Sequence, residues 1–414
     1  RGVVQCEKAV LRARAFARSA EAGAVSAQGA VVIDADTGET LFEQNADSRL
    51  PMASTTKIMT ALVALGEGDL DRVYTVKPGY AAVEGSSMYL QAGERLSLRD
   101  TLYGLMLASG NDAAVAIAGE CGGMTAFVGK MNAKAAELGL TDTHFDNPNG
   151  LPSDTHYTTA HELAKITAAA LKDPVFRQIV STKSCTVSGH ALSNHNRLLS
   201  MYDGAIGVKT GFTRAAGRCL VSAAERNGRT IIAVTLNDPN DWNDHREMLD
   251  AGFAQYSEVT LHTAGDTIAN ARVFGGDTAS VPLTAKNTVT AYLLPGEKEK
   301  LQRVRYGEKI CYAPVVKTAQ AGSVEYRLGD CVLARDTLVY GGESLLPAEE
   351  KSFVERIMEG LEIEIENGEW GMTLSLREFH PRCVGIAAER RNCIPPVRQH
   401  IHFPFSILHF PLKQ

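Results

Sequence analysis

The pattern of apolar and polar positions along the first 257 residues predicts both strands and helices. Residues 28–44 alternate around the turn Asp36-Thr37-Gly38, which predicts a β-hairpin. From Ser54 onward, apolar residues recur at spacings of three and four, which predicts a helix; because it is apolar nearly all round, the helix should be buried. Asp112 is expected to cap a later helix. The further predicted helices cover residues 98–108, 113–119, 124–138 and 159–172.

From residue 205 the pattern becomes that of strands. Runs over 206–212, 218–224 and 230–237 are separated by short turns, including the hairpin signal Asn227-Gly228, and a helix over 243–256 follows. A strand pair, several helices, a strand triple and a last helix together predict an α/β (α+β) domain with an antiparallel sheet flanked by helices.

Beyond residue 257 the helical period disappears. Short β-like runs alternate with Gly, Asp and Asn turns up to about residue 340, which predicts a small all-β domain. A helix is predicted over 348–360, and the basic tail from about 375 has no clear period and is expected to be unpacked. The predicted organisation is therefore an N-terminal segment at 1–24, a first domain at 25–257, a β-rich domain at 258–345, and a helix and tail at 346–414.

Composition narrows the function classes. The 414 residues are 44% hydrophobic and carry a formal net charge of -6, which is ordinary for a globular protein and argues against nucleic-acid binding. No apolar run is long enough to predict a transmembrane helix. The first 18 residues are mixed and charged and do not resemble a signal peptide, and the chain begins with Arg rather than Met.

Cysteine and histidine positions do not predict a metal site. The eight cysteines lack metal-ligand spacing and are expected to be mostly buried thiols, with a disulfide between Cys311 and Cys331 as an alternative in an oxidising compartment. His400, His402 and His409 are too loosely spaced for the fixed geometry of a metal centre. No metal or cofactor is predicted.

The sequence Ser54-Thr55-Thr56-Lys57 carries the first candidate chemistry. Positions three apart on a helix share a face, so the Ser54 hydroxyl and the Lys57 amine can lie side by side. A serine hydroxyl needs an adjacent base to become a nucleophile, and a lysine can serve if burial and a nearby cation lower its pKa. The helix N-terminus favours negative charge developing at Ser54.

Two further motifs follow in order. In Ser109-Gly110-Asn111, a loop between two apolar helices, Ser109 can relay a proton and Asn111 can hydrogen-bond a substrate amide. In Lys209-Thr210-Gly211, on a predicted strand, Lys209 supplies positive charge, Thr210 can bind a carboxylate, and Gly211 lets a substrate backbone approach. Each motif alone is weak, because a lone Ser-x-x-Lys is usually an ordinary helix start.

Together, the three motifs match the signature of β-lactamases and penicillin-binding proteins, except that Gly110 stands where that signature has Asp. The chain resembles the serine-type D-alanyl-D-alanine carboxypeptidase family, the low-molecular-mass penicillin-binding proteins of the β-lactamase/transpeptidase-like superfamily. The likeness is strong over 25–257, and 258–345 resembles the β-rich second domain of the family. It extends to the blocks at 51–62, 85–90, 105–114 and 202–211 and to Ala216-Gly217.

The resemblance implies a role for each motif residue. Ser54 would be acylated by the penultimate D-Ala carbonyl of a pentapeptide stem, with Lys57 as the general base. Ser109, assisted by Lys209, would return the proton, and Lys209 and Thr210 would bind the terminal carboxylate.

Two positions near the implied substrate site differ among members of the family. Backbone N–H groups of Ser54 and Phe212 would form the oxyanion hole, and some members carry His where Phe212 stands. Members often place an Arg on the last helix of the first domain, for which Arg246 is the nearest candidate.

The resemblance also implies partners and location. Substrates would be peptidoglycan pentapeptide stems, β-lactams would be covalent inhibitors, and the enzyme would act outside the cytoplasm, secreted or peripherally attached. Members often end in an amphipathic helix on the membrane. Here the predicted helix runs into Glu362-Ile-Glu-Ile-Glu, which departs from that pattern and leaves peripheral membrane contact open.

Two alternatives remain at this point. A serine β-lactamase would use the same acylation chemistry but needs a deacylation base, and Glu162 lies between the second and third motifs, although on a predicted helix. A non-catalytic penicillin-binding module is disfavoured because the serines and lysines of all three motifs are present. His156 and Asn194-His195-Asn196 are interpreted as structural or cleft-lining.

Overall fold

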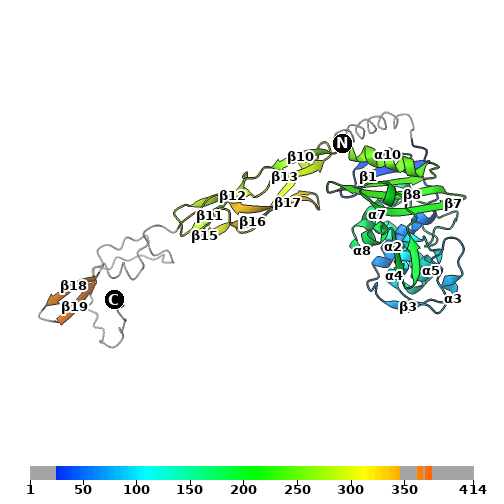
Figure 1. Cartoon of the computed structure of the whole chain (residues 1–414), viewed down its shortest axis with the longest axis horizontal. Coiled ribbons are helices and arrows are strands. Elements are labelled where there is room, and N and C mark those ends of the chain that lie inside the picture. The colour runs from blue at the N-terminus through cyan, green and yellow to red at the C-terminus, as the bar shows by residue number, and fades with distance from the viewer. Residues whose placement is uncertain (1–24, 346–360, 367–368, 375–414) are drawn as a thin grey trace. The chain divides into compact units, whose positions relative to one another are not determined.

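The computed structural model describes residues 25–345, 361–366 and 369–374. Its first sheet has five strands in the order β2-β1-β9-β8-β7, and all neighbours are antiparallel. Helices cover both faces: α10 lies on one face, and α2, α7 and α8 lie on the other (Figure 1). The strands are β1 (Gly29–Asp34), β2 (Thr40–Gln44), β7 (Ala205–Thr213), β8 (Gly217–Arg226) and β9 (Arg229–Leu236).

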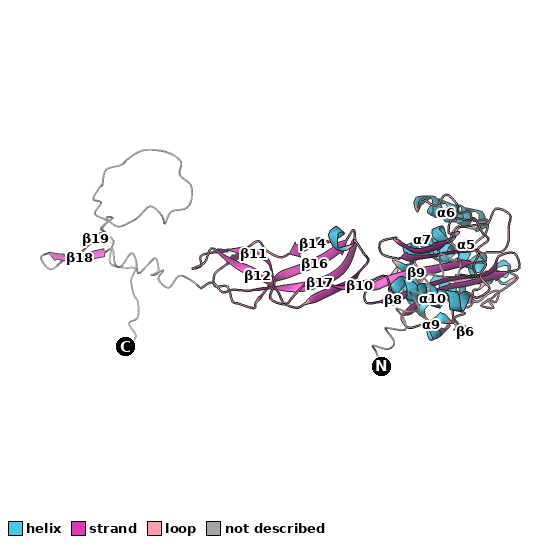
Figure 2. Ribbon diagram, turned by 90° about the horizontal axis from the view of Figure 1, so that it is seen from above, coloured by secondary structure: helices cyan, strands magenta, loops and turns pink. Residues whose placement is uncertain are grey.

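Helices concentrate before Phe253, and strands dominate from Ser257 (cyan and magenta in Figure 2). Two small two-stranded sheets, β3/β4 and β5/β6, lie among the helices. The elements are η1 (Ala53–Thr56), α2 (Lys57–Leu65), β3 (Val73–Thr75), α3 (Pro78–Ala81), β4 (Arg95–Ser97), α4 (Leu98–Leu107), α5 (Asn111–Glu120), α6 (Met124–Glu137), α7 (Ala160–Leu171), α8 (Pro174–Ser181), β5 (Ser184–Val187), β6 (His190–Ser193), α9 (Leu198–Met201) and α10 (Asp241–Phe253).

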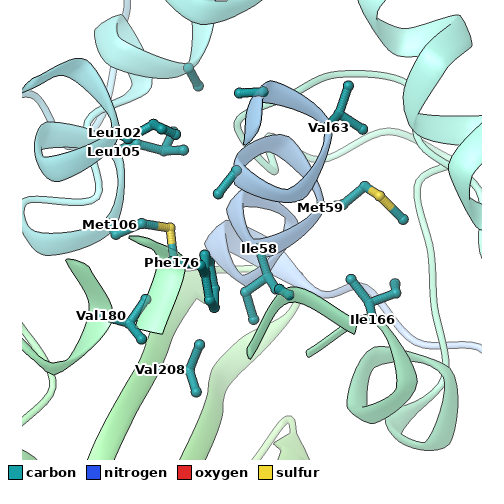
Figure 3. Close-up of a cluster of buried hydrophobic side chains, with 14 of the residues drawn as sticks. Ile58, Met59, Val63, Leu102, Leu105, Met106, Ile166, Phe176, Val180 and Val208 are labelled. Atoms are coloured by element: carbon teal, nitrogen blue, oxygen red, sulfur yellow. The ribbon is translucent and has the colours of Figure 1, made fainter. Parts of the chain in front are cut away.

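The two faces of the sheet belong to separate cores. Along β1, Val31 and Ile33 join the core on the α2 side, whereas Ala30 and Val32 join the core under α10. Successive side chains of a strand point to opposite faces, and all eight residues of β9 are buried because both faces are covered. Figure 3 shows the centre of the larger core, where α2 packs between its neighbours. Its labelled residues are Ile58, Met59, Val63, Leu102, Leu105, Met106, Ile166, Phe176, Val180 and Val208.

The segment after α10 is built almost entirely of strands. Antiparallel pairs join β10 with β13, β14 with β16, β16 with β17 and β17 with β12, and β11 runs parallel to β15. The bounds are β10 (Ser257–His262), β11 (Thr267–Phe274), β12 (Ser280–Ala285), β13 (Val289–Leu293), η2 (Lys298–Lys300), β14 (Gln302–Tyr306), β15 (Ile310–Tyr312), β16 (Gln320–Leu328) and β17 (Cys331–Tyr340).

The described residues fall into two compact units. One contains 25–270, 282–309 and 317–341, and the other contains 271–281, 310–316 and the described residues from 342 onward. The predicted boundary between 257 and 258 stays a prediction. None of the helices in the described ranges has the length and apolar character needed to span a bilayer.

The predicted fold class is confirmed: an antiparallel sheet flanked by helices is followed by a β-rich segment. Cys311 and Cys331 are free thiols, so the expectation of unpaired cysteines holds for them and the alternative disulfide is wrong. Two details differ from the sequence analysis. Gly110, not Asp112, is the N-cap of α5. Strands β18 (Leu361–Glu366) and β19 (Glu369–Leu374) form an antiparallel pair that was not predicted. The segment 1–24, the helix at 348–360 and the tail from 375 lie outside the described residues.

Substitution of Phe176 tests how much the core around α2 contributes to the stability of the fold. Its side chain is 1% exposed and lies among residues of α2, α4 and α8 (Figure 3). Replacing it with Ala should lower the free energy of unfolding by about 3–5 kcal/mol, because apolar burial is lost and a cavity remains. Chemical denaturation measures the change. Met124→Ala, at a 40% exposed position, serves as the control and should change stability by less than about 0.5 kcal/mol.

Candidate active site

Ser54 and Lys57 lie where a short 3-10 turn becomes a helix. Ser54 belongs to η1, Lys57 is the first residue of α2, and Lys57 Nζ is 2.9 Å from Ser54 Oγ. Ser54 is partly exposed, whereas Lys57 is completely buried. The predicted side-by-side arrangement is therefore present, with the hydroxyl at the surface and the amine beneath it.

The Lys57 amine has two more acceptors. Nζ is 2.7 Å from Asn111 Oδ1 and 2.7 Å from the carbonyl oxygen of Asn149. Asn111 Nδ2 donates to the Glu84 carbonyl at 2.7 Å, which fixes the amide oxygen toward Lys57. A neutral amine has two hydrogens and one lone pair. If the hydrogens go to Asn111 and Asn149, the lone pair is left for the Ser54 hydroxyl hydrogen, which is the geometry of a general base.

The electrostatic surroundings favour that neutral form. Burial lowers the pKa of Lys57 well below its ordinary value, and the cation of Lys209 lowers it further, while Asp112 acts in the opposite direction. Burial disfavours the charged state of an amine because its hydration is lost. The conditions that the sequence analysis required for a lysine base are met.

The Ser109-Gly110-Asn111 motif is held by a buried carboxylate. Asp112 accepts hydrogen bonds from the backbone N–H groups of Met88 and Leu90, both at 3.0 Å, and from Ser87 Oγ at 2.6 Å. This ties the start of α5, and with it Asn111, to the loop that precedes β4. Ser109 is 4% exposed in a left-handed conformation with φ 57°, and its hydroxyl makes no hydrogen bond within the described ranges.

The Lys209-Thr210-Gly211 motif lies on β7, an edge strand of the sheet. Lys209 is 1% exposed and donates to the Thr210 carbonyl at 2.8 Å. Burial lowers its pKa to about 7. The Thr210 side chain is half-buried. An edge strand offers unpaired backbone groups to an extended peptide, so this motif places a cation beside a surface that can bind substrate backbone.

Gly211 brings β7 against the nucleophile. A Cβ at this position would lie 3.0 Å from Ser54 N and 3.2 Å from Ala53 Cβ, so any side chain would push the strand away. Ser54 N is in the first turn of a helix, where N–H groups have no intrahelical acceptor. Phe212 follows with its side chain 66% exposed. The N–H groups expected to form the oxyanion hole therefore belong to segments in close contact.

A loop that the sequence analysis did not single out completes the site. Asn149 supplies the third acceptor of Lys57, and Gly150 lies against Ala53 so closely that a Cβ would meet its carbonyl oxygen at 1.9 Å. His156 anchors the same loop: its Nδ1 accepts from Asp146 N, so its Nε2–H donates to Thr56 Oγ1 at 2.8 Å. Burial lowers the His156 pKa to about 4, which keeps the ring neutral. The turn-forming run Asn147-Pro-Asn-Gly was a usable signal for this loop.

The remaining candidate residues differ in the groups that they contact. Glu162 accepts from Thr141 N at 2.8 Å and from Asp142 N at 3.0 Å, so its carboxylate fastens a loop to α7. Burial lowers the His195 pKa and the cation of Lys209 lowers it further, which links His195 electrostatically to the third motif. Arg246 lies on α10, across the sheet from α2, and in the described part of the chain no contact joins it to the three motifs.

Comparisons with known proteins point to one enzyme family. The family model for D-alanyl-D-alanine carboxypeptidases matches residues 15–240, and that for the C-terminal domain of penicillin-binding protein 5 matches 256–344. The chain belongs to the D-alanyl-D-alanine carboxypeptidase family. It is 34% identical to the D-alanyl-D-alanine carboxypeptidase DacF of Bacillus subtilis over 80% of this chain and 89% of that protein.

Two solved structures of related proteins align with different lengths of this chain. The Streptomyces K15 DD-transpeptidase is 38% identical with a TM-score of 0.53, over 56% of this chain and 98% of that one. Penicillin-binding protein 5 from Haemophilus influenzae is 29% identical with a TM-score of 0.55, over 78% of this chain and 98% of that one. The likeness thus extends from the sheet with its three motifs into the β-rich segment.

The pH dependence of acylation tests whether Lys57 is the base. A neutral amine is required, so the acylation rate should fall as pH drops through the lowered pKa of Lys57. Asn111→Asp places a carboxylate where Oδ1 lies 2.7 Å from Nζ. The carboxylate favours the ammonium form and should move the acidic limb up by about 1–3 pH units. The rate of acylation by penicillin, followed across pH, measures it.

The control for this experiment is Asn45→Asp, which adds the same charge at an exposed position. Its pH profile should overlay that of the parent. An acidic limb that does not move in Asn111→Asp would show that the titrating base is a group other than Lys57.

Proposed function

We propose that this chain is a serine D-alanyl-D-alanine carboxypeptidase that removes the terminal D-Ala from peptidoglycan pentapeptide stems. The observation that carries the proposal is the distance of 2.9 Å between Lys57 Nζ and Ser54 Oγ. The amine is buried and its pKa is lowered well below the ordinary value, whereas the serine is partly exposed. Membership in the carboxypeptidase family supports the same reaction. In the acylation step, Ser54 Oγ attacks the penultimate D-Ala carbonyl and its proton passes to Lys57 Nζ.

The leaving group and the second half-reaction follow from the same residues. The C–N bond breaks as the terminal D-Ala amine takes a proton from Lys57 through Ser109, which leaves an ester on Ser54. Water then attacks the ester, and Ser54 recovers its proton. Backbone N–H groups of Ser54 and Phe212 stabilise the oxyanion in both halves.

The remaining assignments concern binding and location. Lys209 and Thr210 bind the terminal carboxylate, Gly211 admits the substrate backbone, and Asn111 both orients Lys57 and binds a substrate amide. β-Lactams acylate the same serine. We assign these roles to the part of the chain at 25–257, with 258–345 as a β-rich stand, and we place the enzyme on the cell-wall side of the membrane. Peripheral attachment to the membrane stays open.

The assignment of the nucleophile is tested by mass spectrometry of the intact protein after exposure to penicillin. The mass should increase by one whole penicillin, since ring opening loses no atoms, and peptide mapping should place the adduct on Ser54. Ser54→Ala should abolish both the adduct and release of D-Ala from a D-Ala-D-Ala peptide. Ser48→Ala, at an exposed position, is the control and should behave like the parent. An adduct on a different peptide would refute the assignment, and rapid loss of the adduct would favour a β-lactamase.

The carboxylate role of Thr210 is tested by comparing penicillin with its methyl ester. Thr210→Val keeps the shape of the side chain and removes its hydroxyl. The variant should slow acylation by penicillin by roughly tenfold to a hundredfold, as expected for a lost hydrogen bond to a charged group. Acylation by the ester should change much less, and Thr260→Val, on an exposed strand position, should change neither. Equal losses with acid and ester would refute the role.

A further inference from the structure

A buried arginine, Arg229, links the end of the five-stranded sheet to a segment that follows α10. Its side chain is 2% exposed, although a guanidinium carries its charge at any ordinary pH. Nη2 donates to Asp34 Oδ2 at 2.6 Å and to Glu297 Oε1 at 2.9 Å, and Nε donates to Asp34 Oδ2 at 3.1 Å. The roles given above to the three motifs do not use this cluster.

The two carboxylates belong to different parts of the chain. Asp34 is the last residue of β1, and Arg229 is the first residue of β9, which pairs with β1 in the same sheet. Glu297 is the N-cap of η2, in the connection from β13 to β14. Asp34 therefore neutralises Arg229 within the sheet, whereas Glu297 ties a later segment to it. All three residues lie in the same compact unit.

Arg229 would keep its main partners if Glu297 were to leave. The Asp34 carboxylate is held by two backbone N–H groups of the turn that follows β1 and by the Tyr256 hydroxyl. The guanidinium also lies 4.9 Å from the centre of the Tyr256 ring. A buried cation is costly only when it lacks a partner, and Arg229 would retain both a counter-charge and an aromatic face. The bond to Glu297 can therefore break without leaving an unpaired buried charge.

The packing beside this bond is incomplete. A cavity of about 230 Å³ is lined by the β8–β9 turn at 227–229, by residues 290–292 of β13 and by Leu333 of β17. A void provides no contacts between the groups that line it. Small contacts between parts of a chain permit relative movement unless they are large and apolar. The ion pair is therefore the main polar fastening at this point.

We propose that Glu297 is a releasable latch. Its bond to Arg229 holds β13 and β17 beside the β8–β9 turn, and breaking the bond lets these strands move away about the connection between α10 and β10, residues 254–256. The three motifs and their support around Ser54 stay in place when the latch opens. This inference goes beyond the proposed function and does not rest on it.

A native thiol reports the state of the latch. Cys331 begins β17, is half-buried and is free. Burial raises the pKa of its thiol, and the charges of Arg229 and Glu297 act on it as well, which places the thiol near the latch. The full-length protein is alkylated with iodoacetamide and with a maleimide that carries a polyethylene glycol chain, and adducts are mapped by mass spectrometry. The ratio of the bulky to the small reagent's rate reports steric access, because the thiolate fraction affects both rates equally.

Glu297→Gln should raise this ratio at Cys331 by about tenfold. A glutamine has one acceptor oxygen for two donors, Arg229 Nη2 and Leu294 N, which the carboxylate serves with separate oxygens. Loss of one hydrogen bond to a charged group shifts a two-state equilibrium by about this factor. Glu297→Ala, which removes both acceptors, should raise the ratio at least as much.

Two controls separate release of the latch from general loosening. Cys185 is also half-buried and free but lies on β5, and its ratio should be the same in every variant. Glu299→Gln removes an exposed carboxylate two residues from the latch and should match the parent at Cys331. Penicillin acylation of Ser54 should be equal in the parent and in Glu297→Gln.

Each other outcome has a definite meaning. A Cys331 ratio that stays at the parent value in both Glu297 variants, or that rises together with the Cys185 ratio, overturns the latch. Loss of penicillin acylation in Glu297→Gln alone overturns the independence of the site from the latch. If the parent itself is not acylated, the proposed function is wrong, and the Cys331 ratios still decide the latch.

Discussion

The burial of Lys57 without a carboxylate partner is the constraint on which the rest of the site depends. Its amine has a hydroxyl, an amide oxygen and a backbone carbonyl as acceptors, and each is an uncharged group. A buried ammonium is costly, so burial shifts the amine toward its neutral form. The fold thus lowers the pKa of a residue that is ordinarily a cation, and it does so mainly by excluding water.

This exclusion comes from backbone segments that meet at Ser54. The loop at Gly150 lies against Ala53, and β7 at Gly211 lies against the Ser54 N–H, so two chain segments far apart in sequence close over the start of α2. Ala53 itself has φ 48°, a conformation that non-glycine residues adopt rarely and that is found at sites held by their surroundings. The nucleophile is therefore positioned by contact on both sides as well as by its own helix.

Local patterns in the sequence predicted the parts of this site that depend on local geometry. The helical spacing of Ser54 and Lys57 sufficed to pair them, and the apolar period of α2 predicted its burial. The comparisons also confirmed the family that the three motifs indicated. Contacts that use backbone atoms could not be predicted in this way, because a carbonyl such as that of Asn149 has no side-chain signature.

Asp112 is a second residue whose role could not be predicted from the local sequence. Its position before an apolar run favoured a helix cap, yet tertiary structure places its carboxylate on the N–H groups of Met88 and Leu90. The strand pair β18/β19, in contrast, had a local signal in the sequence. Leu361-Glu-Ile-Glu-Ile-Glu alternates apolar and polar residues as a strand does, and the turn signal Asn-Gly follows it. That signal was present, but the predicted helix ended at residue 360 and no strand was assigned to the residues after it.

The two buried lysines of the site differ in what lowers their pKa. Burial lowers the pKa of both lysines, to about 7 for Lys209, and the Lys209 cation lowers the pKa of Lys57 further. A substrate carboxylate at Lys209 would favour the Lys209 ammonium and offset its field at Lys57. Burial, the larger cause of the lowered pKa of Lys57, would remain. In the proposed mechanism the two lysines therefore keep distinct roles: Lys209 holds charge, and Lys57 accepts a proton.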